Sequence, residues 1–324
     1  MTYRLTGLGL GMAAGVTLAA ALASTASAQT VGIATSNPGS IFHNIGTAVA
    51  SAANEAGLRA TIQPATSPNQ YIPLVASGGI EFGAANFQEI AYAHDGQEWF
   101  SGQEYPDLQL VAMIMPIVEA IFVRADSDIH SLQDMVGQPM VDGYTAQQTI
   151  LPQLDAIYAT EGLSRADFTP VNVPSVVAGA DAFIAGDSVG FIFAHGAGKV
   201  IEADAAVGGL RALSVEPTDE NLALAQSHWP VAYFEQLTAG SRPGVEEDGW
   251  YFAYPMAIFT NANVDEDTVY QMTRAIHDNV ETLRSTFGGF RAFDPETMMV
   301  RESGSVGYHP GAVRFYQEAG LWTE

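Results

Sequence analysis

The motif GDSVG at residues 186–190 has the residue types and the spacing of a serine nucleophile. In a G-x-S-x-G elbow, a strand leads into the serine and a helix follows it, so that the hydroxyl stands on a strained turn and attacks a carbonyl carbon. Here the order is reversed, because residues 175–187 have a helical pattern and the apolar run at residues 188–194 is typical of a strand. We interpret Ser188 as part of a helix-to-strand turn, predict no catalytic residue, and keep a secreted serine hydrolase as a remote alternative.

A second glycine-rich motif, HGAGKV at residues 195–200, lacks the residues that bind a nucleotide phosphate. A P-loop needs glycine at position 193 and serine or threonine at position 200, where the chain has Phe193 and Val200. The chain contains no cysteine, and no H-E-x-x-H motif or aspartate-rich calcium loop accompanies its seven histidines. The sequence therefore predicts neither a cofactor nor a metal site.

Five polar turns stand where a strand-like run gives way to a helical pattern. They lie at residues 36–40, 85–88, 142–148, 173–175 and 195–196. The start of a helix leaves backbone N–H groups unpaired and carries a partial positive charge, and ligands of open α/β sheets bind beyond the carboxyl ends of the strands. We expect the helix starts at Ser40, Thr145 and Gly196 to offer N–H donors to a ligand. Plain N-capping by Ser40 or Asn37 is the alternative at the first turn.

Residues 1–28 have the pattern of a secretory signal peptide. Arg4 precedes an uncharged run rich in Ala, Leu and Gly, and Ala26-Ser27-Ala28 forms a small-residue cleavage motif. Glycine, threonine and serine dilute the apolar run, which disfavours the alternative of a transmembrane anchor. We predict cleavage after Ala28 and export to the periplasm.

The net charge of the chain argues against nucleic acid as a partner. Twelve basic and 36 acidic residues give a formal net charge of −24. Such a surface repels nucleic acid and anionic lipid. We therefore expect a freely diffusing protein that binds no nucleic acid.

Strand-like and helical patterns alternate along the chain, which predicts an α/β fold of two lobes. The first pattern runs from residue 31 to about residue 116, and a second alternation covers residues 117–215. A polar, proline-containing segment follows, and then a strand-like run at residues 250–260 and a helix at residues 265–285. We assign residues 29–116 and 216–324 to lobe 1 and residues 117–215 to lobe 2. We expect a mostly parallel sheet flanked by helices in each lobe, and two hinge crossovers between the lobes.

Four stretches resemble the TAXI-type substrate-binding proteins of TRAP transporters. They are residues 33–57, residues 61–96, the motif IFVRADSDIHSLQDMVGQPMVDG at residues 121–143, and residues 264–279. The resemblance covers essentially the whole chain after the leader. It implies a periplasmic receptor with the type II periplasmic binding protein fold, which binds a small organic carboxylate between its lobes and delivers it to a membrane permease. The expected solute is a small organic anion of the dicarboxylate, amino acid or 2-oxoacid class, and the TRAP permease subunits are the expected partners.

Twelve residues are the expected ligand-binding residues. The first wall of the cleft would be formed by Ser36, Asn37, Gly39, Ser40, Phe42, Tyr71 and Asn86, and the second wall by Tyr144, Thr145, Gln147, Phe193 and His195. A receptor for an ABC-type importer and a binding partner of a membrane sensor are the alternatives, because both use the same kind of fold.

Overall fold

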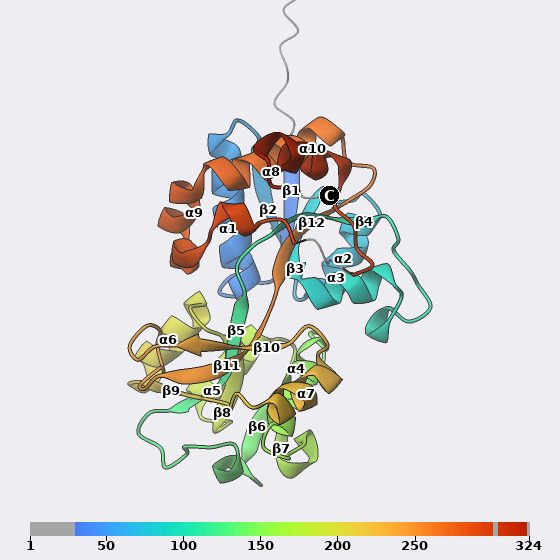
Figure 1. The fold of residues 1–324 in the computed structure, drawn as a ribbon. Helices are drawn as coiled ribbons and strands as arrows, with labels where there is room; N and C mark the ends of the chain where they lie inside the picture. The colour runs from blue at the N-terminus through green and yellow to red at the C-terminus, as the bar shows by residue number, and fades with distance from the viewer. Residues whose placement is uncertain (1–29, 301–303, 323–324) are drawn as a thin grey trace, which may run out of the picture.

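The computed structural model describes residues 30–300 and 304–322. The predicted signal peptide and its cleavage site lie outside these residues. Figure 1 shows two lobes that are joined by extended segments of the chain. In the part of the chain that the structure describes, no helix has the length and apolar character needed to cross a membrane.

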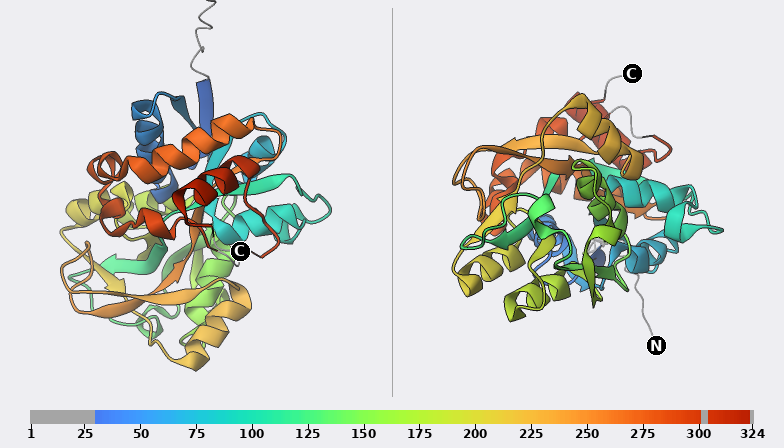
Figure 2. Two further views of the ribbon diagram at one scale, coloured as in Figure 1. Left: turned by 45° about the horizontal axis from the view of Figure 1, so that its top comes forward. Right: turned by 90° about the horizontal axis from the view of Figure 1, so that it is seen from below.

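The first lobe is built on a five-stranded sheet in the order β2-β1-β3-β12-β4. Its strands are β1 (Thr30–Thr35), β2 (Arg59–Pro64), β3 (Phe82–Asn86), β4 (Leu108–Met113) and β12 (Met256–Asn261). Strand β1 runs parallel to β2 and β3, whereas β12 runs antiparallel to β3 and β4. The helices of this lobe are α1 (Ile41–Glu55), α2 (Pro68–Ala76), α3 (Phe87–His94), α8 (Glu266–Asp278), α9 (Val280–Thr286) and α10 (Pro310–Ala319). Helices α8 and α10 lie side by side on the end of this lobe that faces away from the second lobe (Figures 1 and 2).

Helix α1 forms as the sequence pattern predicts. The Ser40 hydroxyl caps the helix by accepting the N–H of His43 at 3.2 Å. Apolar side chains at three- and four-residue spacing, among them Ile45, Val49 and Ala52, are fully buried against the sheet. The helix thereby fixes the turn at residues 36–40 at the carboxyl end of β1.

The second lobe contains an antiparallel sheet rather than the mostly parallel sheet that we expected. Strands β10, β11, β5 and β8 follow one another in this sheet, and β9 also pairs with β5. All of these pairings are antiparallel, and the parallel pair of β6 with β7 stands apart. The strands are β5 (Ile117–Arg124), β6 (Pro139–Tyr144), β7 (Thr169–Val173), β8 (Gly190–Ala194), β9 (Leu210–Leu213), β10 (Tyr233–Leu237) and β11 (Gly249–Tyr254). Buried strands of either direction have the same apolar run, so the sequence pattern did not distinguish them.

Helices cover this second sheet as well. The α-helices are α4 (Ile150–Ala159), α5 (Val176–Ala185), α6 (Gly198–Val207) and α7 (Asp219–His228). Short 3₁₀ helices complete the described elements of both lobes: η1 (Glu98–Phe100), η2 (Gln133–Met135), η3 (Arg165–Asp167), η4 (Gly288–Ala292) and η5 (Pro295–Thr297).

The predicted boundary at residue 215 is wrong, because residues 216–254 belong to the second lobe. Helix α7 packs against α4, and β10 and β11 are hydrogen-bonded into the sheet that contains β5. The strand-like run at residues 250–260 is interrupted at Pro255, so its first half is β11 in the second lobe and its second half is β12 in the first lobe. A continuous apolar run hid this change of lobe from the sequence pattern.

Two segments carry the chain between the lobes, as the fold class predicts. Residues 114–116 connect β4 to β5, and Pro255 connects β11 to β12. The Ile114 N–H donates to the Met256 carbonyl at 2.9 Å, and the Phe87 N–H donates to the Pro255 carbonyl at 3.0 Å. The first bond holds the two crossovers next to each other, and the second joins the Pro255 crossover to the start of α3.

Two buried aromatic side chains connect segments that are distant in the sequence. In the first sheet, the fully buried ring of Phe259 lies over Gly83, where an added Cβ atom would overlap it. Between the lobes, the indole of Trp229 is fully buried. It packs edge-on against Tyr92 of α3 and Tyr254 of β11, with ring centroids 6.1 and 5.8 Å apart, respectively. Trp229 therefore joins the second lobe to a helix of the first.

Candidate functional site

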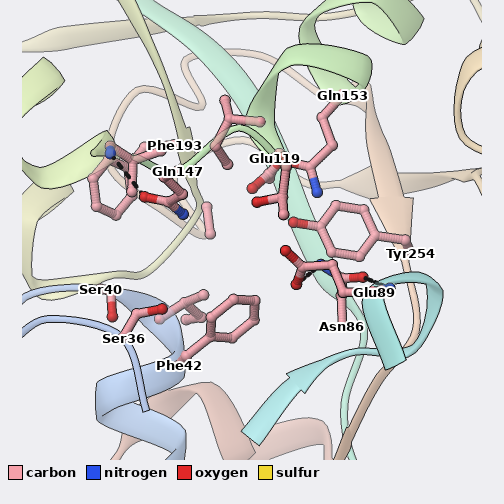
Figure 3. Close-up of a pocket in the computed structure, with 15 residues that line it drawn as sticks. Ser36, Ser40, Phe42, Asn86, Glu89, Glu119, Gln147, Gln153, Phe193 and Tyr254 are labelled. Carbon is pink, nitrogen blue, oxygen red and sulfur yellow. Dashed lines mark hydrogen bonds between the residues drawn. The ribbon is translucent and has the colours of Figure 1, made fainter. Parts of the chain in front are cut away.

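A cavity lies between the two lobes, and Figure 3 shows its lining side chains. Its empty space is about 390 Å³, counting the part that opens to solvent. The first lobe contributes Ser36, Ser40, Ile41, Phe42, Asn86 and Glu89, and the second lobe with the crossover contributes Glu119, Gln147, Thr149, Ile150, Gln153, Val176, Phe193, Ala194 and Tyr254. A molecule held in this cavity would contact both lobes at once.

The wall from the first lobe is organised by the start of α3. Asn86 ends β3 and caps this helix, because its Oδ1 accepts the N–H of Glu89 at 2.8 Å. The Nδ2 group of Asn86 donates to Oε2 of Glu89. These two hydrogen bonds between Asn86 and Glu89 fix the carboxyl group of Glu89 at the cavity.

The wall from the second lobe is organised by β5 and by the segment before α4. Glu119 lies in β5 opposite Phe252 of β11, and the hydroxyl of Tyr254 lies beside its carboxyl group in Figure 3. The side-chain Oε1 of Gln147 accepts the N–H of Val176 at 3.0 Å, which caps the start of α5. Gln147 is therefore held by its own lobe and presents its amide nitrogen side to the cavity.

Four buried oxygen atoms at the cavity have no hydrogen-bond partner among the described residues. They belong to side chains that are at most 5% exposed: Ser36 Oγ, Glu89 Oε1, Glu119 Oε2 and Gln153 Oε1. A buried polar atom without a partner costs about 1 to 3 kcal/mol, so native proteins rarely leave four of them together. A bound molecule with hydrogen-bond donors would satisfy them.

The electrostatics of the cavity are dominated by its two glutamates. Burial raises the pKa of Glu89 to about 8; the Thr149 hydroxyl opposes this rise, and the nearby charge of Glu119 adds to it. Burial likewise raises the pKa of Glu119 to about 7. Among the described residues that line the cavity, none is lysine, arginine or histidine.

The structure brings six of the twelve sequence-predicted residues to the cavity. They are Ser36, Ser40, Phe42, Asn86, Gln147 and Phe193. The other six lie elsewhere: Asn37, Gly39, Tyr71, Tyr144, Thr145 and His195.

In the first lobe, the three residues outside the cavity have structural partners. The Asn37 carbonyl closes the turn by accepting the N–H of Ser40 at 3.1 Å. The hydroxyl of the fully buried Tyr71 donates to the Ala84 carbonyl at 2.6 Å. Gly39 directs its carbonyl to the other lobe, where it accepts the N–H of Lys199 at 3.2 Å.

In the second lobe, the remaining three residues also face away from the cavity. Tyr144 is buried against α5, close to Gly179. Thr145 is exposed, and its hydroxyl donates to the Val173 carbonyl. The ring of His195 packs between Phe122 and Tyr251, with centroids 4.9 and 4.7 Å away. It borders a separate groove between the lobes, near Met115 and Arg242.

The helix start at Thr145 does not have its expected role, and Gly196 lies at a separate groove rather than at the cavity. The N–H groups of Thr145, Ala146 and Gln147 donate to the carbonyls of Val173 and Pro174. At the start of α6, the N–H of Lys199 donates to the Gly39 carbonyl of the first lobe. These amides are occupied by protein carbonyls, so they are not free to bind an anion.

Sequence reasoning missed the polar residues that dominate the cavity: Glu89, Glu119, Thr149, Gln153 and Tyr254. A signal was present for two of them. Glu119 is a charged residue inside an otherwise apolar strand, and Glu89 stands three residues after Asn86, which is the spacing of a capping box.

Ser188 is part of a helix-to-strand turn, as predicted. Helix α5 ends at Gly186, whose φ of +88° is left-handed, and β8 begins at Gly190. The Ser188 hydroxyl accepts the Val141 N–H at 3.1 Å and donates to the Gly190 carbonyl at 2.6 Å. The hydroxyl thus fastens β6 to the start of β8.

Replacing Ser188 with alanine should lower stability without changing solute affinity. The Val141 N–H would lose its buried acceptor, which corresponds to about 1 to 3 kcal/mol in the free energy of unfolding. Urea denaturation and calorimetric titration measure the two quantities. Ester or amide hydrolysis by the parent protein that disappears in Ser188→Ala would contradict this interpretation.

Comparisons with known proteins identify the fold and the family of the chain. A protein from Bordetella bronchiseptica RB50 aligns with a TM-score of 0.56 and 11% identity over 90% of this chain and 98% of its own. PhnD1 from Prochlorococcus marinus, in complex with methylphosphonate, aligns with a TM-score of 0.54 and 7% identity over 90% and 99% of the two chains. These similarities show a two-lobed α/β fold of the type II periplasmic binding protein kind. A family model matches residues 33–320, and by this match the chain belongs to the NMT1-like family.

Proposed function

We propose that the protein is an extracytoplasmic solute receptor, which closes its lobes over a small solute and presents it to a membrane partner. The observation that carries this proposal is the cavity between the lobes, where buried oxygen atoms from both sides have no protein partner. Enclosed polar atoms of this kind are typical of a binding site whose ligand supplies the missing hydrogen bonds.

Few direct contacts hold the edges of the cleft together. The Ser67 hydroxyl donates to the Ala146 carbonyl at 3.1 Å, and the Lys199 N–H donates to the Gly39 carbonyl at 3.2 Å. Each is a single neutral hydrogen bond, worth about 1 kcal/mol net. Opening would exchange these bonds for water and rotate the lobes about residues 114–116 and Pro255. A solute that contacts both walls would favour the closed form.

The predicted signal peptide supports a periplasmic location for this receptor. Neither the family match nor the structural similarities support the TRAP-type partner that the sequence resemblance implied. The proposed transport partner is a membrane permease, either of an ABC-type importer or of a TRAP transporter, and a membrane sensor is a further alternative. Co-purification with the membrane proteins of the native host would distinguish these partners.

The receptor function is tested by the solute that the protein carries. Protein purified from the periplasm is denatured, and the released small molecules are identified by mass spectrometry. Added back at a hundredfold excess over its dissociation constant, the bound solute should stabilise the protein by about 2.7 kcal/mol. Small-angle scattering should show compaction at the same time. A solute that binds tightly without compaction would contradict the closure model.

Replacing Gly39 with alanine should weaken solute binding about tenfold. Gly39 has a φ of +91°, which costs an L-residue about 1 to 2 kcal/mol, and its carbonyl contacts Lys199 across the cleft. Gly57 is a matched control, because its φ is +95° and an added Cβ atom would meet nothing within 4 Å. Both variants should lose similar stability, whereas only Gly39→Ala should lose affinity in calorimetric titration. Equal affinities would mean that this edge of the cleft does not contribute to closure.

A further inference from the structure

We propose that the solute is a small organic cation, whose N–H groups bind between the carboxyl groups of Glu89 and Glu119. This inference rests on the proposed receptor function and adds the chemical class of the solute. It replaces the small organic anion that we expected from the sequence.

The two carboxyl groups come from opposite lobes. Glu89 belongs to the first turn of α3 and is fully buried, and Glu119 belongs to β5 and is 5% exposed. Figure 3 shows both groups at the same side of the cavity, with the hydroxyl of Tyr254 beside them. Two carboxylates that approach in a closed cavity repel each other, so a positive charge between them would stabilise closure.

Three of the four unpartnered atoms at the cavity need hydrogen-bond donors, and only the Ser36 hydroxyl can also donate. Glu89 Oε1, Glu119 Oε2 and Gln153 Oε1 carry no hydrogen when the acids are ionised, so they only accept hydrogen bonds. The described lining contains no basic side chain that could pair with these acids. A carboxylate solute would therefore meet like charge and add further acceptors, whereas an ammonium or amidinium group would bring both the charge and the donors.

The rest of the lining indicates an organic molecule rather than a bare metal ion. Six apolar residues line the cavity: Ile41, Phe42, Ile150, Val176, Phe193 and Ala194. Within residues 30–300 and 304–322, no group of three or more His, Cys, Asp or Glu side chains is arranged to hold a metal. The apolar side chains would cover the carbon skeleton of the solute while the acids bind its cationic end.

Protons compete with such a cation for the carboxyl groups of Glu89 and Glu119. Burial raises the pKa of both glutamates, so the ligand-free closed form binds protons near neutral pH. Burial also raises the pKa values of Tyr71, Tyr144 and Tyr254 and lowers that of His43 behind Ser36, which favours the neutral form of each. Cation binding should therefore release protons and tighten as the pH rises from about 6 to about 9.

The experiment uses yeast extract separated into two pools, one retained on a cation exchanger and one retained on an anion exchanger. Each pool is titrated into the full-length mature protein at pH 8, and melting temperature and radius of gyration are measured. The variants are Glu89→Gln and Glu119→Gln, which keep the side-chain size. The matched control is Glu220→Gln, which removes the same charge from the exposed start of α7. Circular dichroism verifies the fold of each variant.

The cation pool should stabilise and compact the parent protein. Both cavity variants should need at least tenfold more of that pool for the same effect, whereas Glu220→Gln should match the parent. Binding should also release protons in a weakly buffered solution at pH 7.

Other outcomes separate the two proposals. Compaction by the anion pool alone would overturn the cation and leave the receptor function standing. Compaction by the cation pool that is unchanged in both cavity variants would overturn the assignment to Glu89 and Glu119. An absence of any effect from either pool would count against the receptor function itself.

Discussion

The ligand-free protein should open and lose stability as the pH is raised from about 5 to about 9. In the closed form, burial raises the pKa of Glu89 to about 8 and that of Glu119 to about 7, above the ordinary value of 4.5 for glutamate. The closed form therefore binds more protons than the unfolded or open form between these values. The stability contributed by these protons is fully present below about pH 4.5 and is lost as the pH rises through 7 and 8.

The expected loss is on the order of a few kcal/mol, because each pKa unit corresponds to about 1.4 kcal/mol and the two acids share part of their effect. Urea denaturation and small-angle scattering across this pH range measure stability and opening. The double variant Glu89→Gln with Glu119→Gln should show a much weaker pH dependence, while Glu220→Gln should follow the parent. A parent protein with the same urea midpoint and radius of gyration at pH 5 and pH 9 would contradict this account.

Replacing Phe259 with alanine should lower the free energy of unfolding by about 3 to 5 kcal/mol. The ring is fully buried in β12, which lies between β3 and β4 in the first sheet. Removing it leaves a cavity beneath the strands that carry Asn86 and lead to the Pro255 crossover. Thermal and urea denaturation measure the loss. Phe234→Ala is the control, since Phe234 is only partly buried in the edge strand β10 and should cost less.

Gly83 provides an independent check on the same packing. A Cβ atom at this position would overlap the Phe259 ring, so Gly83→Ala should destabilise the protein when the ring is present. Combined with Phe259→Leu, the substitution should cost less than the sum of the two single changes, because they share one space. Additive losses in denaturation experiments would mean that the two residues do not compete for it.

Local chemistry was predictable from the sequence where a short motif determines it. The cap at Ser40 and the helix-to-strand order around Ser188 follow from residue types within a few positions of each other. The two-lobed α/β fold follows from the alternation of patterns along the chain. Strand direction and the lobe assignment of residues 216–254 did not follow, because they depend on pairing between distant segments and on a single proline within one apolar run.

The chemistry of the cavity was harder to predict than its position. Glu89 and Glu119 lie 30 positions apart in different lobes, and only the fold brings their carboxyl groups to one cavity. The amide of Thr145 looked free in the sequence because its acceptor, the Val173 carbonyl, is also distant along the chain. A cleft was correctly expected between the lobes, but the sign of its charge depended on these long-range contacts.

The indole that bridges the lobes gives the protein an optical reporter of its own state. Trp229 is fully buried between Tyr92 of the first lobe and Tyr254 at the crossover. Separating the lobes would bring water to the indole, and the emission of tryptophan moves to longer wavelength in a wetter environment. A variant that keeps Trp229 and replaces the other three tryptophans with phenylalanine would report opening without any attached dye. Stopped-flow fluorescence would then resolve the rate at which the receptor closes.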